Sequence, residues 1–216
     1  MESSGVYWKA ADGTGEAEKL GVAPDRYLIP FSWSSDGKTL VTMETADSTR
    51  FDIGMLSMEG DRTWKPLLQH EKYTEIWPQI SPDGRWMAYA SNESGHYEVY
   101  VRPFPEVNKG RWPVSTSGGN YPLWSPNGRE LFYLSSDSVM AVAVRTEPTV
   151  RLGTSKALFR LTYFNSSGTP WDISPDGKRF LMMKEAGTNT AARQEPQRIN
   201  IVLNWFEELK RQVPMK

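Results

Sequence analysis

Few side chains in this sequence could take part in chemistry, and they are scattered along it. The chain has no cysteine, which excludes disulfides, thiolate catalysis and cysteine-based zinc sites. Its two histidines, His70 and His96, lie in polar stretches that read as loops. Although histidine is the usual general base near neutral pH, we expect both to be ordinary surface residues.

The signatures of two large enzyme classes are also missing. A protein kinase needs a glycine-rich phosphate loop, a strand lysine, His-Arg-Asp and Asp-Phe-Gly. Gly13-Thr14-Gly15 lacks the third glycine of the phosphate loop, and Phe51-Asp52-Ile53-Gly54 resembles the Asp-Phe-Gly motif only superficially. A serine hydrolase needs a Gly-x-Ser-x-Gly elbow, which does not occur. We predict no catalytic residue, metal ligand or cofactor here, so any kinase or hydrolase domain would lie outside this chain.

Three aspartates, Asp36, Asp83 and Asp176, could in principle serve as calcium ligands, because hard cations favour clustered oxygen atoms. Their spacing places them in three separate repeats of the chain, and each has a sufficient local role in a turn. The sequence favours that structural role.

The aspartates belong to a turn that occurs four times, with its glycines 47, 44 and 49 residues apart. A serine always stands three residues before the glycine, and a lysine or arginine always follows it. Proline presets φ, Asp or Asn bonds nearby backbone, and glycine accepts positive φ. We assign structural roles in these turns to Ser34, Asp36, Gly37, Ser81, Pro82, Asp83, Gly84, Ser125, Pro126, Asn127, Gly128, Ser174, Pro175, Asp176 and Gly177.

Each turn joins two short strands into a β-hairpin, and further strands follow. Third strands are predicted at residues 52–57, 98–104, 139–144 and 198–205. Fourth strands are predicted at residues 63–67, 111–115 and 156–161. Four-stranded sheets of about 45 residues, stacked around an axis, are the blades of a β-propeller. The sequence therefore predicts an all-β propeller of four-stranded antiparallel blades.

The repeat also divides the chain. Residues 1–216 are predicted to form one propeller portion of about four and a half blades, more naturally an arc than a closed ring. Asn204 resembles the start of a capping box, and Pro214 would end the helix that follows it. The predicted parts are outer strands of a partial blade at 1–21, blades at 22–69, 70–117, 118–162 and 163–205, and a short helix at 205–213.

The Ser-Pro-Asp-Gly-Lys/Arg turn between such strands resembles the PD40 repeat. This is the WD40-like propeller repeat of TolB and of prolyl-oligopeptidase-type peptidases. The likeness extends from about Val6 to Trp205, and Ser35 and Asn127 depart from the pattern as good turn formers. The ending Asn204-Trp205-Phe206-Glu207-Glu208-Leu209-Lys210 resembles the carboxyl terminus of bacterial proteins in which a serine/threonine kinase domain precedes such a propeller.

The resemblance implies a non-catalytic interaction or sensor module that binds a protein, peptide or small ligand through blade loops. It leaves two settings open: the carboxyl-terminal part of a bacterial serine/threonine kinase, or the gating propeller of a prolyl-oligopeptidase-like hydrolase whose catalytic domain is absent. Candidate contacts are the loop 92–97 and the aromatic residues Trp112, Tyr121, Tyr163 and Phe164. Inter-blade packing and an ordinary hairpin tip are the alternatives for these residues. Partners could also be a second half ring or missing N-terminal blades.

Composition limits the partners further. The net charge of −1 gives no reason to expect nucleic acid or an anionic membrane surface. The chain has no apolar run of the roughly 18 residues that a transmembrane helix needs. The first residues show no signal-peptide pattern. We expect no membrane contact by this chain itself. The kinase setting implies an extracytoplasmic location, but the sequence leaves the compartment open.

Overall fold

The computed structural model describes residues 6–20, 26–45, 50–147, 149–160 and 170–183, and the backbone of 200–201. The predicted strand residues 198–199 and 202–205, the predicted helix at 205–213, and Tyr163 and Phe164 lie outside these ranges. The described residues form antiparallel strands and one short 3-10 turn, η1 (Val107–Lys109). Among them no helix is long and apolar enough to cross a lipid bilayer.

Two sheets each consist of four antiparallel strands that pair in chain order. The first sheet contains β3 (Tyr27–Trp33), β4 (Thr39–Thr45), β5 (Asp52–Ser57) and β6 (Trp64–Leu68). The second sheet contains β7 (Glu75–Ile80), β8 (Trp86–Ser91), β9 (Glu98–Pro103) and β10 (Trp112–Pro113). In both sheets the glycine-containing turn connects the first strand to the second.

The remaining strands form three further sheets. The third sheet contains β11 (Asn120–Trp124), β12 (Glu130–Ser135), β13 (Ser138–Arg145) and β15 (Lys156–Arg160), with the short β14 (Arg151–Leu152) on the end of β13. The fourth contains β16 (Trp171–Ile173), β17 (Phe180–Met182) and β18 (Asn200–Ile201). A two-stranded sheet pairs β1 (Tyr7–Trp8) with β2 (Glu18–Lys19).

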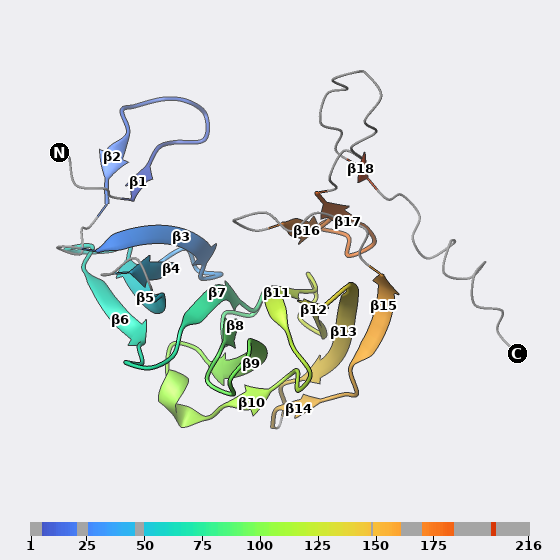
Figure 1. Ribbon diagram of the computed structural model, residues 1–216. Helices are drawn as coiled ribbons and strands as arrows, with labels where there is room; N and C mark the ends of the chain where they lie inside the picture. Colours follow the sequence, from blue (N-terminus) through green and yellow to red (C-terminus); the bar gives the residue numbers. More distant parts are fainter. Residues whose placement is uncertain are drawn as a thin grey trace, which may run out of the picture.

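The sheets lie side by side in an arc (Figure 1). The first strand of each large sheet, β3, β7, β11 or β16, lies on the inner side of the arc. The last strands β6, β10 and β15 lie on its outer side. The turns that join the first two strands of successive sheets are therefore neighbours along the arc.

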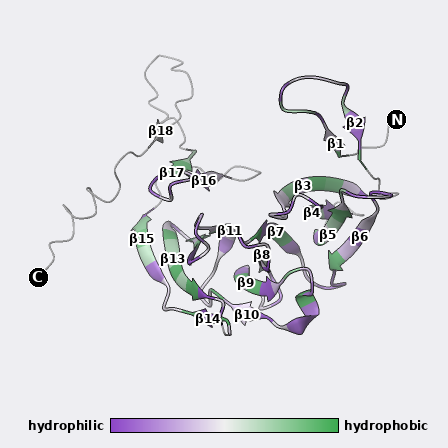
Figure 2. Ribbon diagram, turned by 180° about the vertical axis from the view of Figure 1, so that it is seen from behind, coloured by the Kyte–Doolittle hydropathy of each residue, from purple (hydrophilic) through white to green (hydrophobic). Residues whose placement is uncertain are grey.

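The apolar core lies between sheets. Val41 and Ile53 of the first sheet pack with Met87 and Tyr89 of the second, and equivalent clusters join the second sheet to the third and the third to the fourth. A strand that is covered on both faces is mostly apolar, as the largely green β13 illustrates in Figure 2. This confirms the predicted all-β propeller fold with four-stranded antiparallel blades. The proposed blade boundaries stay a prediction.

Strand ends differ modestly from the prediction. In the segment 111–115 the strand covers only Trp112–Pro113. The Val114 N–H that follows still donates to the Val99 carbonyl at 2.8 Å. The third sheet has an extra short strand, β14, that the sequence did not indicate.

Candidate binding surface

The four repeated turns share one hydrogen-bonded geometry. In each, the glycine N–H donates to the carbonyl of the serine three residues earlier at 2.8–2.9 Å, and the glycine φ is 68–73°. The serine hydroxyl donates to the Asp or Asn side chain at 2.5–2.9 Å. It also accepts the backbone N–H five residues ahead at 2.9–3.0 Å. The serine thus connects the turn to the first residues after it.

This double role of the serine was missed from the sequence, although its fourfold recurrence was the available signal. The Asp or Asn oxygen accepts a second bond from the N–H after the glycine, at 2.9–3.1 Å. Hydrogen bonds from Ser34 and the Lys38 N–H hold the pKa of Asp36 below its usual value, and Ser174 and the Lys178 N–H do the same for the pKa of Asp176. Both carboxylates are therefore ionised at neutral pH.

The three aspartates considered for calcium are each bonded to the serine of their own turn, and of the three only Asp36 and Asp83 line a common cavity. Among the residues that the structure describes, no group of three or more His, Cys, Asp or Glu side chains could hold a metal ion.

Successive turns also touch each other along the arc. An added Cβ at Gly128 would lie 3.6 Å from Cδ of Pro82, and one at Gly177 would lie 3.5 Å from Cδ of Pro126. The proline of each turn therefore packs against the glycine of the next turn. At the junction of the first and second sheets, Ser35 takes the proline's place, 2.6 Å from the Cβ position of Gly84.

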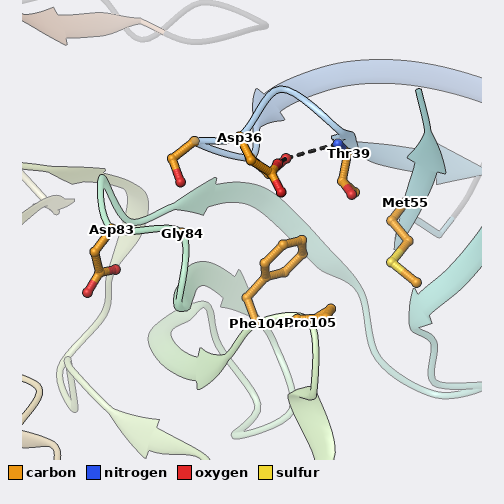
Figure 3. A pocket seen from close by; sticks show the side chains of 9 residues that line it. Asp36, Thr39, Met55, Asp83, Gly84, Phe104 and Pro105 are labelled. Carbon is orange, nitrogen blue, oxygen red and sulfur yellow. Dashed lines mark hydrogen bonds between the residues drawn. The ribbon is translucent and has the colours of Figure 1, made fainter. Parts of the chain in front are cut away.

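A cavity of about 400 Å³ lies beside this first junction. Figure 3 shows side chains from the β3–β4 turn, from β5 and from the segment after β9 facing the same space. Its size falls within the range of small-molecule sites. The residues that define its polar and apolar walls are Ser35, Asp36, Asp83, Met55, Phe104 and Pro105.

A row of aromatic rings crosses the inner strands of three sheets. Phe31 on β3 meets Trp77 on β7 edge to face, with ring centroids 5.4 Å apart. Trp77 stacks on Tyr121 of β11 at 4.5 Å. All three side chains are partly exposed, and the strand pairing is irregular beside each of them.

Two members of this row have an unfavourable backbone conformation. Trp77 and Tyr121 have φ values of 58° and 50°, and each precedes a proline. Bulky residues rarely adopt positive φ, and such conformations persist mainly where the surrounding structure or a function requires them. The aromatic row is therefore the strongest candidate for a contact surface on the inner side of the arc.

The two histidines, which we expected to be ordinary surface residues, and the other predicted contact residues within the described ranges have local partners. His96, in the loop 92–97, lies 2.7 Å from the buried carboxylate of Glu98. His70 stacks on Tyr73 with ring centroids 4.3 Å apart. Trp112 meets Trp86 edge to face on the outer strand of its sheet, whereas Tyr121 belongs to the aromatic row.

Two buried glutamates between the first and second sheets were also missed. Glu44, fully buried, faces the Arg26 guanidinium at 3.0 Å. Glu75 is 3% exposed. Its Oε1 accepts a 3.5 Å bond from Ser91, while its buried Oε2 has no partner. Burial, assisted by the charges of Asp52 and Glu93, raises the pKa of Glu75 to about 7.

Comparison with known proteins finds solved structures with a similar propeller fold. The structure of a putative TolB from Agrobacterium tumefaciens is similar with a TM-score of 0.62 and 22% identity, over 80% of this chain and 62% of that one. TolB from Acinetobacter baumannii gives 0.58 and 16%, over 82% and 42%. A puromycin-hydrolyzing peptidase from Mycobacterium tuberculosis gives 0.60 and 15%, over 83% and 35%. These likenesses show the fold.

No family model matches the chain. A curated relative, the uncharacterized protein Atu1656 of Agrobacterium fabrum, is 30% identical over 162 residues, which are 70% of this chain and 53% of the relative. The chain thus spans about half the length of the curated relative that it matches.

Proposed function

We propose that the chain is a non-catalytic propeller module that recognises a protein or peptide through the inner side of its arc and its blade loops. The supporting observation is the aromatic row Phe31, Trp77 and Tyr121, two of whose members keep an unfavourable backbone conformation. Aromatic side chains supply large contact areas with few rotatable bonds, which makes them common at the centres of interfaces. The likeness to TolB structures supports an interaction module of this kind.

The test uses peptides selected from a random display library on the purified chain. Glycine accepts positive φ without strain, so Trp77→Gly and Tyr121→Gly remove the rings without adding backbone strain. We expect each variant to bind the selected peptides at least about tenfold more weakly, as is typical for central aromatic contacts. Fluorescence anisotropy measures the affinities.

Trp112→Ala, on the outer strand β10, is the matched control and should bind as the wild type does. Selected peptides that bind Trp77→Gly and Tyr121→Gly with wild-type affinity would contradict the proposal. A turnover that disappears when one side chain of this chain is changed would contradict its non-catalytic character.

Two settings fit such a module. One is the carboxyl-terminal sensor part of a bacterial serine/threonine kinase, which the sequence ending resembles. The other is the gating propeller of a hydrolase whose catalytic domain lies elsewhere, which the fold likeness to a puromycin-hydrolyzing peptidase favours. The reading frame upstream of Met1 separates them: kinase signatures there support the first, and a neighbouring α/β-hydrolase supports the second.

Exposed aromatic side chains lie at the β1–β3 end of the arc: Tyr7, Trp8, Tyr27 and Trp33 are 43–53% exposed. Exposed apolar surface of this kind suits the packing of another sheet, either from a second half ring or from further blades. Light scattering on the purified chain tests the half-ring pairing. A measured mass of a dimer would support the pairing of half rings, and a folded monomer would contradict it.

A further inference from the structure

The cavity lies beside the first turn, which has a serine at the position where the other three turns have a proline. At the two later junctions, a proline ring packs against the glycine of the next turn, as Pro82 does on Gly128. At the first junction the corresponding residue is Ser35. A hydroxyl group therefore stands where the repeat otherwise places an apolar ring.

The cavity has two chemically different walls. Met55, Phe104 and Pro105 form an apolar wall, and the hairpin turns contribute Ser35, Asp36 and Asp83 as a polar wall. Small-molecule sites commonly combine an apolar lining with a few placed polar groups. A ligand that fits both walls has an apolar body and one polar head.

The charges at the polar wall determine which sign of charge the polar head of a ligand should carry. Asp83 is already paired with Arg85, which lies 2.9 Å from its Oδ2 and also pairs with Glu147 at 2.6 Å. The amine of Lys38 is paired with Glu59 at 2.9 Å and not with Asp36.

Asp36 thus supplies the excess negative charge. Both hydrogen bonds that the turn makes to its carboxylate, from Ser34 and from the Lys38 N–H, end on Oδ1. The second oxygen, Oδ2, is left for a donor from a ligand. Figure 3 shows the Asp36 side chain on the same space as Phe104 and Met55.

We propose that this cavity binds a small organic cation, with an ammonium or amidinium head on Asp36 and Ser35 and an apolar body against Phe104 and Met55. A charge-assisted hydrogen bond to a carboxylate is among the stronger polar contacts available to such a head. The cavity lies at the turns, whereas the aromatic row lies on the inner strands. A failure of this proposal would therefore not contradict the proposed function, and the reverse also holds.

The test titrates the full chain at neutral pH with phenethylammonium, hexylammonium and benzamidinium chloride, using calorimetry and amide chemical shifts. We expect at least one cation to bind saturably, with shifts centred on Gly84 and Phe104. Phenethyl alcohol, which has the same body without the charge, should bind about tenfold more weakly. Phenylpropionate should not bind at this site.

The repeat supplies matched variants. In Asp36→Asn the turn should persist, because Asn127 makes the same two bonds in the third turn, yet the charge is lost and binding should weaken about tenfold. Ser35→Pro installs the residue that the other three turns contain and should abolish binding. Asp176→Asn makes the same change in the fourth turn and should leave binding unaltered.

Circular dichroism verifies that each variant folds. Saturable binding that Asp36→Asn and Ser35→Pro leave at wild-type strength would overturn the proposal, as would shifts centred elsewhere. The absence of saturable binding for all three cations would overturn it as well.

Discussion

Replacing Ser81 by alanine is expected to lower the free energy of unfolding by about 3 kcal/mol, because it removes two hydrogen bonds at a buried position. Ser81 is 4% exposed. Its hydroxyl donates to Asp83 at 2.5 Å and accepts the Trp86 N–H at 3.0 Å. Alanine cannot make either bond, so the Trp86 N–H loses an acceptor at the start of β8. Urea unfolding monitored by tryptophan fluorescence measures the change.

The fourth turn provides the matched control. Ser174 makes the same two bonds, at 2.5 and 3.0 Å, in a more exposed setting. Water can replace the lost partners there, so Ser174→Ala should cost about 1 kcal/mol. Equal effects of the two substitutions would show that burial does not decide the strength of the turn. If Ser81→Ala left the free energy of unfolding unchanged, the serine hydroxyl would not be needed to stabilise the turn.

Replacing Glu75 by glutamine is expected to abolish most of the change in stability between pH 5 and pH 8. Burial raises the pKa of Glu75 to about 7 in the folded chain, against 4.5 for an unperturbed glutamate. Between these two values the folded chain keeps a proton that the unfolded chain has released. The free energy of unfolding therefore falls as the pH rises from about 4.5 to about 7, by about 3 kcal/mol in total.

Glutamine stays neutral in both states, so Glu75→Gln should be up to about 3 kcal/mol more stable than the wild type at pH 8. The two proteins should differ little at pH 5. Urea unfolding at both pH values measures this, and Glu130→Gln, at an exposed strand position, is the control that should leave the pH dependence unchanged. A wild-type protein that gains stability across this interval would contradict the assignment of a protonated Glu75.

The repeated turns could be predicted from the sequence because their determinants are local. Proline, Asp or Asn, and glycine restrict the backbone within four residues, and recurrence at a spacing near 45 residues then indicates blades. The second bond of each serine was harder to foresee, since its partner is a backbone N–H in the strand that follows the turn.

The cavity and the aromatic row depend on residues that only the folded chain brings together. Ser35 and Gly84 are far apart in sequence, and Phe104 reaches the same space from the segment after β9. The sequence contains an aromatic residue before proline four times, at Trp77, Phe104, Trp112 and Tyr121, and only Trp77 and Tyr121 have a positive φ. Yet local preferences argue against a positive φ for such residues, so the backbone that stacks the two rings could not be inferred from them.

Glu75 illustrates a different obstacle. It follows the polar residues Tyr73 and Thr74 in a stretch that reads as a connection between strands. Its burial arises from the contact between the first and second sheets, where β4 and β5 lie against β7. The sequence around Glu75 alone does not indicate that these two sheets pack together there.

Because each of these apolar clusters is shared by two sheets, a single sheet has no complete core and is not an independent folding unit. Stability then accumulates like that of a linear array, from neighbour to neighbour, and each terminal sheet has one neighbouring sheet among the described residues. Such an array loses order from its ends inward. A whole repeat added or removed at an end would change its length while leaving every inner contact as it is.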